Sequence, residues 1–226
     1  MRMMAVIGSA LLLAMSGFGA MSFEPKPFCA EPGRSEWLGD AESIDLGCMG
    51  PTSPDGRYTL TIDAETEETR GAVIIDTASR QSVHRFDPLI SIPAAFAWAP
   101  DSLALFADDG DGSGQFSRLR LFIFESGRFK EVAGLNDSAL ALFKEAARCR
   151  LPDIGANIWG IQWDPDGRRL LAFIQQDHHT ICPDQMATEV FGLEVSLDKP
   201  LSPRLFGKEE LRQRAGTLLP QRLFED

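Results

Sequence analysis

The chain has 226 residues, of which 44% are hydrophobic, 9% aromatic and 24% charged. This composition is typical of a globular protein with one large or two small domains, and it excludes long disorder, collagen and disulfide-dense miniature folds. The formal net charge of −11 disfavours nucleic acid as a partner, because phosphate backbones are bound by cationic side chains that displace counterions.

Residues 1–22 predict a secretory signal peptide. Arg2 is the only charged residue of this segment, and an apolar run and then small residues follow it. The run is too short for a comfortable membrane span, which takes about 20 apolar residues. We expect cleavage before Phe23, with a cut before Ala20 or an uncleaved anchor as alternatives. The mature domain over 23–226 is then exported, to a periplasm or to the outside, and has no membrane span.

The mature part contains four cysteines, and an even number in an exported chain indicates disulfide bonds. They are Cys29, Cys48, Cys149 and Cys182. Four cysteines allow three pairings, and we expect the local one, in which Cys29 bonds Cys48 and Cys149 bonds Cys182. Zinc ligation is the alternative, but the chain has no Cys-x-x-Cys pair and the two early cysteines lack neighbouring histidines.

Three segments share one pattern, in which an apolar or small-residue stretch precedes a Pro-Asp turn and an apolar strand follows it. They are residues 48–63, 94–108 and 159–174. In Ser53-Pro54-Asp55-Gly56 the proline, aspartate and glycine suit successive positions of a type I turn. Asp164-Pro165-Asp166-Gly167 repeats this turn, and Ala99-Pro100-Asp101-Ser102 keeps it with serine in the last place.

Each turn leads into a strand and then into a further hairpin, so each unit predicts four antiparallel strands. The strands after the turns are expected at 58–62, 103–106 and 170–174, and the two later ones are nearly continuous apolar runs, which indicates burial on both faces. The hairpins are expected at 72–76 with 82–86, at 119–125 with 128–132, and at 189–195 with 203–206. The three units lie near 44–87, 94–134 and 158–207.

The turn segments resemble the WD40-like (PD40) repeat of TolB-type β-propellers. The residues that carry the resemblance are Pro54-Asp55-Gly56-Arg57, Trp98-Ala99-Pro100-Asp101 and Trp163-Asp164-Pro165-Asp166-Gly167-Arg168. It implies an all-β fold of antiparallel four-stranded blades, which in that family are scaffolds for binding and sometimes accompany peptidase domains. Three blades are recognisable, whereas closed propellers have at least about four. A divergent fourth unit within 23–45, an open array or pairing between chains are the alternatives.

Two helices are expected beside the strands. The interval from Pro54 to Pro100 is 46 residues, that from Pro100 to Pro165 is 65, and the surplus falls mostly on an insertion at 136–152 with a helical pattern. Its expected N-cap is Asp137 or Ser138. One face of this helix carries Leu140, Phe143 and Ala147. The insertion either covers a sheet edge or presents an interaction surface, and a short C-terminal helix is expected at 208–214.

No catalytic motif appears in the sequence. There is no G-x-S-x-G elbow, no P-loop and no dinucleotide-binding glycine pattern, and the only histidines are His84, His178 and His179. Adjacent His178 and His179 point to opposite faces of an extended segment, so a solvated loop is favoured over a metal site.

Asp109, Asp111 and Ser113 occupy alternate positions of an acidic, glycine-rich loop that matches the first half of a calcium loop. Arg120 stands where the bidentate glutamate of such a loop would be. An ordinary acidic hairpin loop is the alternative, and no other cofactor is expected. Trp98, Trp159 and Trp163 are expected either in the core or as an aromatic platform for a sugar or peptide.

Two functions are consistent with these features. The first is an exported, non-enzymatic binding module with a protein partner, built on the repeat scaffold. The second is a small exported hydrolase or metal-dependent enzyme on a truncated propeller. The first is favoured, because no catalytic constellation accompanies the repeat.

Overall fold

The computed structural model describes residues 36–38, 52–66, 69–87, 90, 94–110, 117–148, 155–176, 189–198, 201–216, 218–219 and 223–224. The expected signal peptide at 1–22 and all four cysteines lie outside these residues.

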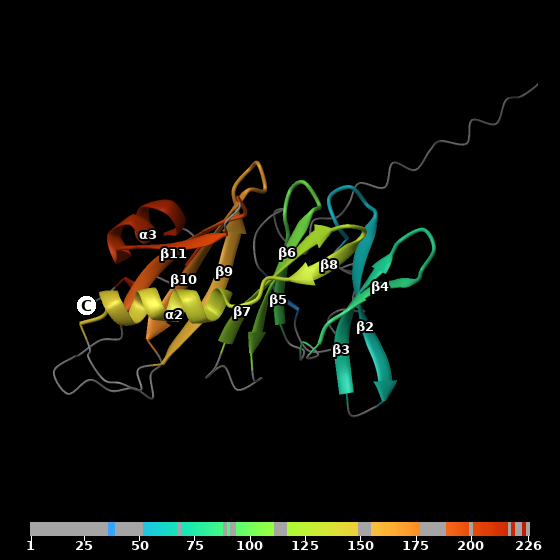
Figure 1. The fold of residues 1–226 in the computed structure, drawn as a ribbon, viewed down its shortest axis with the longest axis horizontal. Helices are drawn as coiled ribbons and strands as arrows, with labels where there is room; N and C mark the ends of the chain where they lie inside the picture. The colour runs from blue at the N-terminus through green and yellow to red at the C-terminus, as the bar shows by residue number, and fades with distance from the viewer. Residues whose placement is uncertain are drawn as a thin grey trace, which may run out of the picture.

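The described strands form three antiparallel sheets (Figure 1). The first sheet contains β2 (Tyr58–Thr66), β3 (Thr69–Asp76) and β4 (Ser82–Arg85). The central sheet contains, in spatial order, β1 (Glu36–Leu38), β5 (Ala94–Trp98), β6 (Ala104–Gly110), β7 (Ser117–Glu125) and β8 (Arg128–Glu131). The third sheet contains, in spatial order, β12 (Ser202–Phe206), β11 (Val190–Ser196), β10 (Arg169–Gln176) and β9 (Ala156–Trp163).

The expected unit of a strand, a Pro-Asp turn and three further strands is complete in the central and third sheets, as β5 to β8 and β9 to β12. In the first sheet the strands after the turn are present, and a single bridge between Thr52 and Thr59 stands where the strand before the turn begins. The short strand β1, which the repeat pattern did not predict, pairs with β5 and extends the central sheet. The described strands do not close into a ring.

Strands β5 to β7 of the central sheet are packed on both faces, because their alternate residues contact the other two sheets. Phe96 and Leu105 belong to the apolar cluster shared with the first sheet, and Ala97 and Phe106 belong to the cluster shared with the third. Since side chains of a strand alternate between its two faces, burial on both faces requires a continuous apolar run. The run at 103–106 meets this requirement except at Leu103, which is 51% exposed at the end of the sheet.

The insertion forms helix α2 (Leu135–Ala146), which begins before both residues that we expected to cap it. The N-cap residue is Gly134, with φ +73, and no side chain caps the helix, so the assignment of the cap to Asp137 or Ser138 was wrong. The left-handed glycine lets the chain turn directly from β8 into the helix. Asn136 then bonds the β7 backbone, because its amide donates to the Leu119 carbonyl at 2.8 Å and accepts from the Leu119 N–H at 3.2 Å.

Helix α2 covers the apolar residues between the central and third sheets (Figure 1). Leu135, Ala139 and Phe143 are buried there, and Leu140 is packed at the margin. The residues that point outward are polar or small: Asp137, Ser138, Ala141, Lys144 and Glu145. The helix is therefore part of the core and exposes no broad apolar surface.

Helix α3 (Lys208–Ala215) covers the outer face of the third sheet. Leu211 and Ala215 are buried against Leu171 and Phe206 of that face. Four residues that follow the helix pack on the same cluster: Leu218, Leu219, Leu223 and Phe224. Among the described helices, none is long and apolar enough to cross a membrane.

The contact between β9 and β6 depends on Gly160. A Cβ atom on Gly160 would overlap the ring of Phe106, which is fully buried. Gly160→Ala is expected to lower the free energy of unfolding by about 1–3 kcal/mol, because a fully packed aromatic ring must shift. Denaturant unfolding measures this loss. The double variant Gly160→Ala with Phe106→Leu should recover part of the loss, and equal stability of wild type and Gly160→Ala would contradict the packing argument.

Candidate functional site

The three Pro-Asp turns lie side by side along one edge of the sheet stack (Figure 1). We call this surface the turn edge and define it as residues 53–57, 99–103 and 164–168. In each turn the backbone N–H of the fourth residue donates a hydrogen bond to the carbonyl of the first residue. The donor and acceptor residues are Gly56 and Ser53 at 2.7 Å, Ser102 and Ala99 at 2.9 Å, and Gly167 and Asp164 at 3.0 Å. A second bond runs from the N–H of the first residue to a carbonyl of the following strand, at 2.7 to 2.8 Å in all three.

The last position of each turn has a left-handed backbone. Gly56 has φ +74 and Gly167 has φ +67, and the serine at the same place, Ser102, has φ +64. The left-handed region costs an L-residue about 1–2 kcal/mol, and glycine avoids this cost. A compensating contact is present at Ser102, because its hydroxyl oxygen accepts a hydrogen bond from the Asp55 N–H at 3.0 Å. The serine thus joins the first turn to the second.

The second turn contacts the third through a carboxylate. Asp101 accepts a hydrogen bond from the Leu103 N–H at 2.9 Å, which holds its side chain along the turn. A Cβ atom on Gly167 would lie 3.1 Å from the Asp101 carboxyl carbon, which is tighter than an ordinary contact, so glycine favours the close approach of the third turn. The turn edge is therefore one continuous surface rather than three separate loops.

Side-chain hydrogen bonds also fix each turn internally. The Ser53 hydroxyl donates to Asp55 at 2.6 Å, and the same Asp55 oxygen accepts from the Arg57 N–H at 3.0 Å. In the third turn one oxygen of Asp164 accepts from the N–H groups of Arg168 and Arg169. Partial burial raises the pKa of Asp164, but these hydrogen bonds and the charge of Arg169 outweigh it and leave the pKa below its ordinary value.

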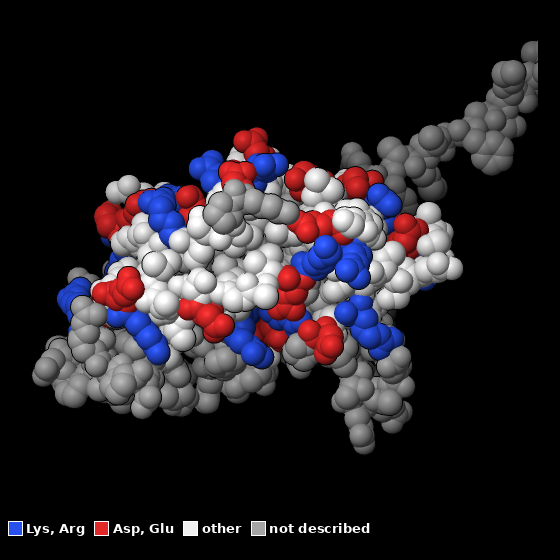
Figure 2. Space-filling view, in the orientation of Figure 1, with Lys and Arg blue, Asp and Glu red and all other residues white. Residues whose placement is uncertain are grey.

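Charged side chains and one leucine are exposed on the turn edge. Asp55, Asp101 and Asp166 are exposed together with Arg57 and Arg168, and Figure 2 shows acidic and basic side chains interspersed along this edge. The Arg57 guanidinium lies over the Tyr58 ring at 5.0 Å, which holds a flexible cation in place. Leu103 is the large hydrophobic residue that is exposed in the described part of the chain.

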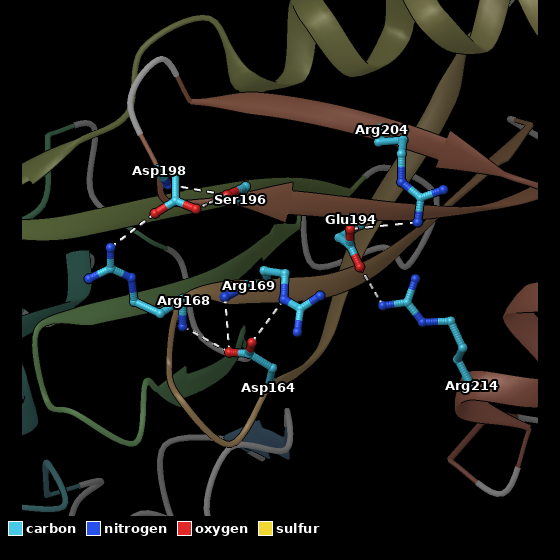
Figure 3. Close-up of polar contacts among 8 residues, drawn as sticks. All are labelled: Asp164, Arg168, Arg169, Glu194, Ser196, Asp198, Arg204 and Arg214. Carbon is cyan, nitrogen blue, oxygen red and sulfur yellow. Dashed lines mark hydrogen bonds and ion pairs between the residues drawn. The ribbon is translucent and has the colours of Figure 1, made fainter.

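An ion-pair network continues from the third turn across the third sheet to α3 (Figure 3). Its ion pairs are Arg169 with Asp164, Arg168 with Asp198, Arg204 with Glu194 and Arg214 with Glu194. Partial burial raises the pKa of Glu194, but the hydrogen bond and charge of Arg214 and the charges of Arg204 and Arg169 outweigh it, so the pKa is lowered. This network helps to hold α3 on the sheet and fixes the third turn from behind.

Polar side chains are buried at the opposite end of the central sheet. Arg120 of β7 is 5% exposed and binds Glu131 through two hydrogen bonds of 2.9 and 2.6 Å. It also contacts Asp109 at 3.4 Å and donates to the Asp87 carbonyl at 3.2 Å. Burial raises the pKa of Asp109, and the charges of Arg120 and Arg118 oppose this shift.

The structure places one of the three calcium candidates. Asp109 lies in β6, where it pairs with Arg120, the residue at the last position of the expected loop. Asp111 and Ser113 lie outside the described residues, as do His178 and His179. Within the part of the chain that the structure describes, no three His, Cys, Asp or Glu side chains are grouped so that they could hold a metal ion.

Asp108, the neighbour of Asp109, faces the other way, toward the third sheet. It is buried, and one of its oxygens accepts a hydrogen bond from the Gly160 N–H at 2.7 Å. β9 is the edge strand of the third sheet, and it contains a bulge between Gly160 and Gln162. Burial raises the pKa of Asp108 well above 3.8, and the hydrogen bond from Gly160 opposes this shift. Sequence reasoning missed Asp108; its signal was an Asp-Asp pair in a strand with two buried faces.

The three tryptophans that the sequence singled out have different environments. Trp98 and Trp163 are buried, and the Trp163 indole N–H donates to the Ala97 carbonyl at 3.0 Å, which ties the third sheet to the central one. Trp159 is half-buried on the outer face of the third sheet, where it stacks on Phe173 with ring centroids 4.8 Å apart. Trp98 and Trp163 therefore belong to the core.

Comparison with known proteins adds no family to this geometry. No protein-family model matches the sequence, and no curated protein matches it. What the turn edge does must therefore be argued from its own residues.

The strained serine of the second turn provides a direct test of the turn edge. Ser102→Ala should lower the free energy of unfolding by about 0.5–1.5 kcal/mol, because it keeps the positive φ and loses the hydrogen bond to Asp55. Ser102→Gly loses the same bond but relieves the backbone, so its stability should be within about 0.5 kcal/mol of wild type. Denaturant unfolding of the three proteins compares them. A glycine variant less stable than the alanine variant would show that the backbone of Ser102 is not strained.

The raised pKa of Asp108 predicts an opposite response to pH from that of an ordinary surface carboxylate. When folding raises the pKa of a carboxyl group, its protonated form stabilises the folded protein. This stability is fully present below the unfolded pKa of 3.8, and it is lost as the pH rises through the pKa of the folded state. Asp108→Asn keeps the acceptor for Gly160 and cannot ionise. The unfolding free energy of the variant minus that of wild type should therefore increase with pH above about 4. A difference that stays constant between about pH 4 and pH 8 would exclude the shift.

Proposed function

We propose that this protein is an exported, non-enzymatic binding module that presents the turn edge to a protein partner. The observation that carries the proposal is that three equivalent turns lie against one another, the first bonded to the second and the third close to Asp101, with Leu103 exposed between charged side chains. A surface that is already ordered loses little conformational entropy on binding, so more of the contact energy remains as affinity. Export is part of the proposal and rests on the N-terminal pattern and the even number of cysteines.

The three sheets are interpreted as blades of a β-propeller-like scaffold of the PD40 type. The equivalent turns and the face-to-face stacking support this interpretation. Helix α3 and the residues after it occupy the outer face of the third sheet, where the next blade of a ring would pack. We therefore favour an open array of blades within one chain over a closed ring.

The turn edge is a better contact surface than the helical insertion. The apolar residues of α2 are buried in the core, and its outward face lacks an apolar anchor. On the turn edge, by contrast, Leu103 is exposed and its neighbours are held by hydrogen bonds. Protein interfaces commonly have an apolar centre within a polar rim, and Leu103 can supply that centre here.

The charge of the turn edge favours a basic or neutral partner. Three aspartates, Asp55, Asp101 and Asp166, are exposed there against two arginines, Arg57 and Arg168. The whole chain has a formal charge of −11, which adds to the same potential. Complementary charge speeds encounter and selects among partners more than it adds affinity.

The alternative is a small exported hydrolase or metal-dependent enzyme. One observation favours it: Asp108 and Asp109 both have raised pKa values, and shifted carboxyl groups are common in active sites. The two side chains point to opposite faces of the central sheet, however, and each has a structural partner, Gly160 or Arg120. This geometry does not bring them together on one substrate.

Affinity capture from an envelope extract tests the binding function. Leu103→Glu should reduce capture of the partner at least about tenfold, because a charge replaces the apolar centre of the surface. Ala141→Glu, on the exposed face of α2, adds the same charge elsewhere and should capture as wild type does. Circular dichroism checks that both variants fold.

Equal capture of the partner by wild type and by Leu103→Glu would show that the partner binds elsewhere than on the turn edge. Turnover by the purified wild-type protein on panels of peptides, esters and glycosides would overturn the non-enzymatic function itself.

A further inference from the structure

The packing of the first sheet on the central sheet contains a histidine in an unusual place. His84 of β4 lies among three phenylalanine rings, with its ring centroid 5.0 Å from that of Phe86, 5.4 Å from Phe122 and 6.4 Å from Phe129. Phe122 and Phe129 belong to the central sheet, so the imidazole stands at the contact between the two sheets.

One nitrogen of this imidazole has no partner. His84 Nε2 is buried and makes no hydrogen bond. A neutral imidazole can leave this nitrogen unprotonated, at the cost of one unsatisfied acceptor. A protonated imidazole would place an N–H donor and a positive charge there, and a buried charge without a partner costs far more than a buried neutral group.

The charged neighbours of His84 do not offset that cost. Arg120 of β7 and Glu131 of β8 face it, and the Arg120 guanidinium lies over the Phe122 ring at 5.3 Å, so that ring already interacts with a cation. Glu131 would favour a charged imidazole, but both of its oxygens are hydrogen-bonded to Arg120. Burial and then the charge of Arg120 lower the pKa of His84, and Glu131 opposes them without reversing the direction.

We propose that His84 is a pH-sensitive contact that holds the first sheet on the central sheet while it is neutral and loosens it when it is protonated. Separation of the sheets gives the imidazole water and removes it from Arg120. Acid therefore favours the separated state, which exposes the apolar faces that the two sheets now share. This inference does not depend on the turn edge or on the identity of a partner.

The direction and the pH window follow from linkage. When folding lowers the pKa of a histidine, its neutral form stabilises the folded protein. This stability is present above the ordinary pKa of 6.5, and it is lost as the pH falls toward the pKa of the folded state. One proton is taken up per opening, so the equilibrium constant for separation should rise up to about tenfold per pH unit within this window.

The full chain offers two specific readouts. It contains a single tyrosine, Tyr58 of β2, which stacks on Trp98 of the central sheet with ring centroids 6.3 Å apart. Energy transfer to Trp98 quenches tyrosine emission while the sheets are packed. Exchange protection of the β2, β3 and β4 amides, corrected for the intrinsic pH dependence of exchange, reports the same opening.

The experiment lowers the pH from about 7.5 to about 5 in the variant His178→Gln with His179→Gln, where His84 is the only histidine. We expect Tyr58 emission to rise and protection of the first sheet to fall, while protection of β9 to β12 in the same molecule does not fall, because acid strengthens their contact through Asp108. His84→Phe in the same background keeps an aromatic ring and cannot be protonated, so its first sheet should stay protected.

Equal loss of protection with and without His84→Phe would overturn the proposal. The pKa of His84, measured by NMR titration in the His178→Gln, His179→Gln variant, tests the proposal even if the His84→Phe variant does not fold. A measured pKa at or above 6.5 would contradict a sheet contact that prefers neutral His84, and a measured pKa below 6.5 would support this contact.

Discussion

Burial of both faces of the central sheet is the constraint on which the rest of the structure depends. Phe96, Leu105 and Phe122 need the first sheet, and Ala97, Phe106 and Leu119 need the third sheet and α2. Neither outer sheet can be removed without exposing one of these faces, and burial of apolar area is the main favourable term in folding. The helices complete this arrangement, since α2 covers the margin between two sheets and α3 ends the stack on the far face of the third sheet.

Polar side chains have different environments at the two ends of the stacked sheets. At the turn edge, polar side chains are exposed and bond the backbone of the turns, so they shape a surface. At the opposite end they are buried and bond between strands and sheets, as Arg120 does with Glu131 and Asp108 with Gly160. Buried polar groups cost stability unless they are paired. We therefore propose the end with exposed, pre-ordered groups as the recognition surface, and we expect the buried end to contribute to the pH dependence of stability.

Adjacent residues can have opposite roles when their strand is buried on both sides. Asp108 accepts a hydrogen bond from the Gly160 N–H of the third sheet, whereas Asp109 faces Arg120 on the side of the first sheet. On that same side His84 and Arg120 both pack on the Phe122 ring, and the charge of Arg120 lowers the pKa of His84. Stability lost through Asp108 on raising the pH and stability lost through His84 on lowering it work in opposite directions, so the two sheet contacts respond differently to acid.

The strands other than β1, the three turns and both helices could be predicted from the sequence, because turn chemistry and hydrophobic periodicity are local properties. It also indicated burial on both faces of β6 and β10 from their continuous apolar runs. Which side chains meet depends on the tertiary structure. The bond from Asp55 to Ser102, the partners of Asp108 and Asp109 and the place of His84 among phenylalanines all join residues that are far apart in the chain. The start of α2 at Leu135 also depends on a tertiary contact, because the hydrogen bonds of Asn136 to β7 take the place of a local cap.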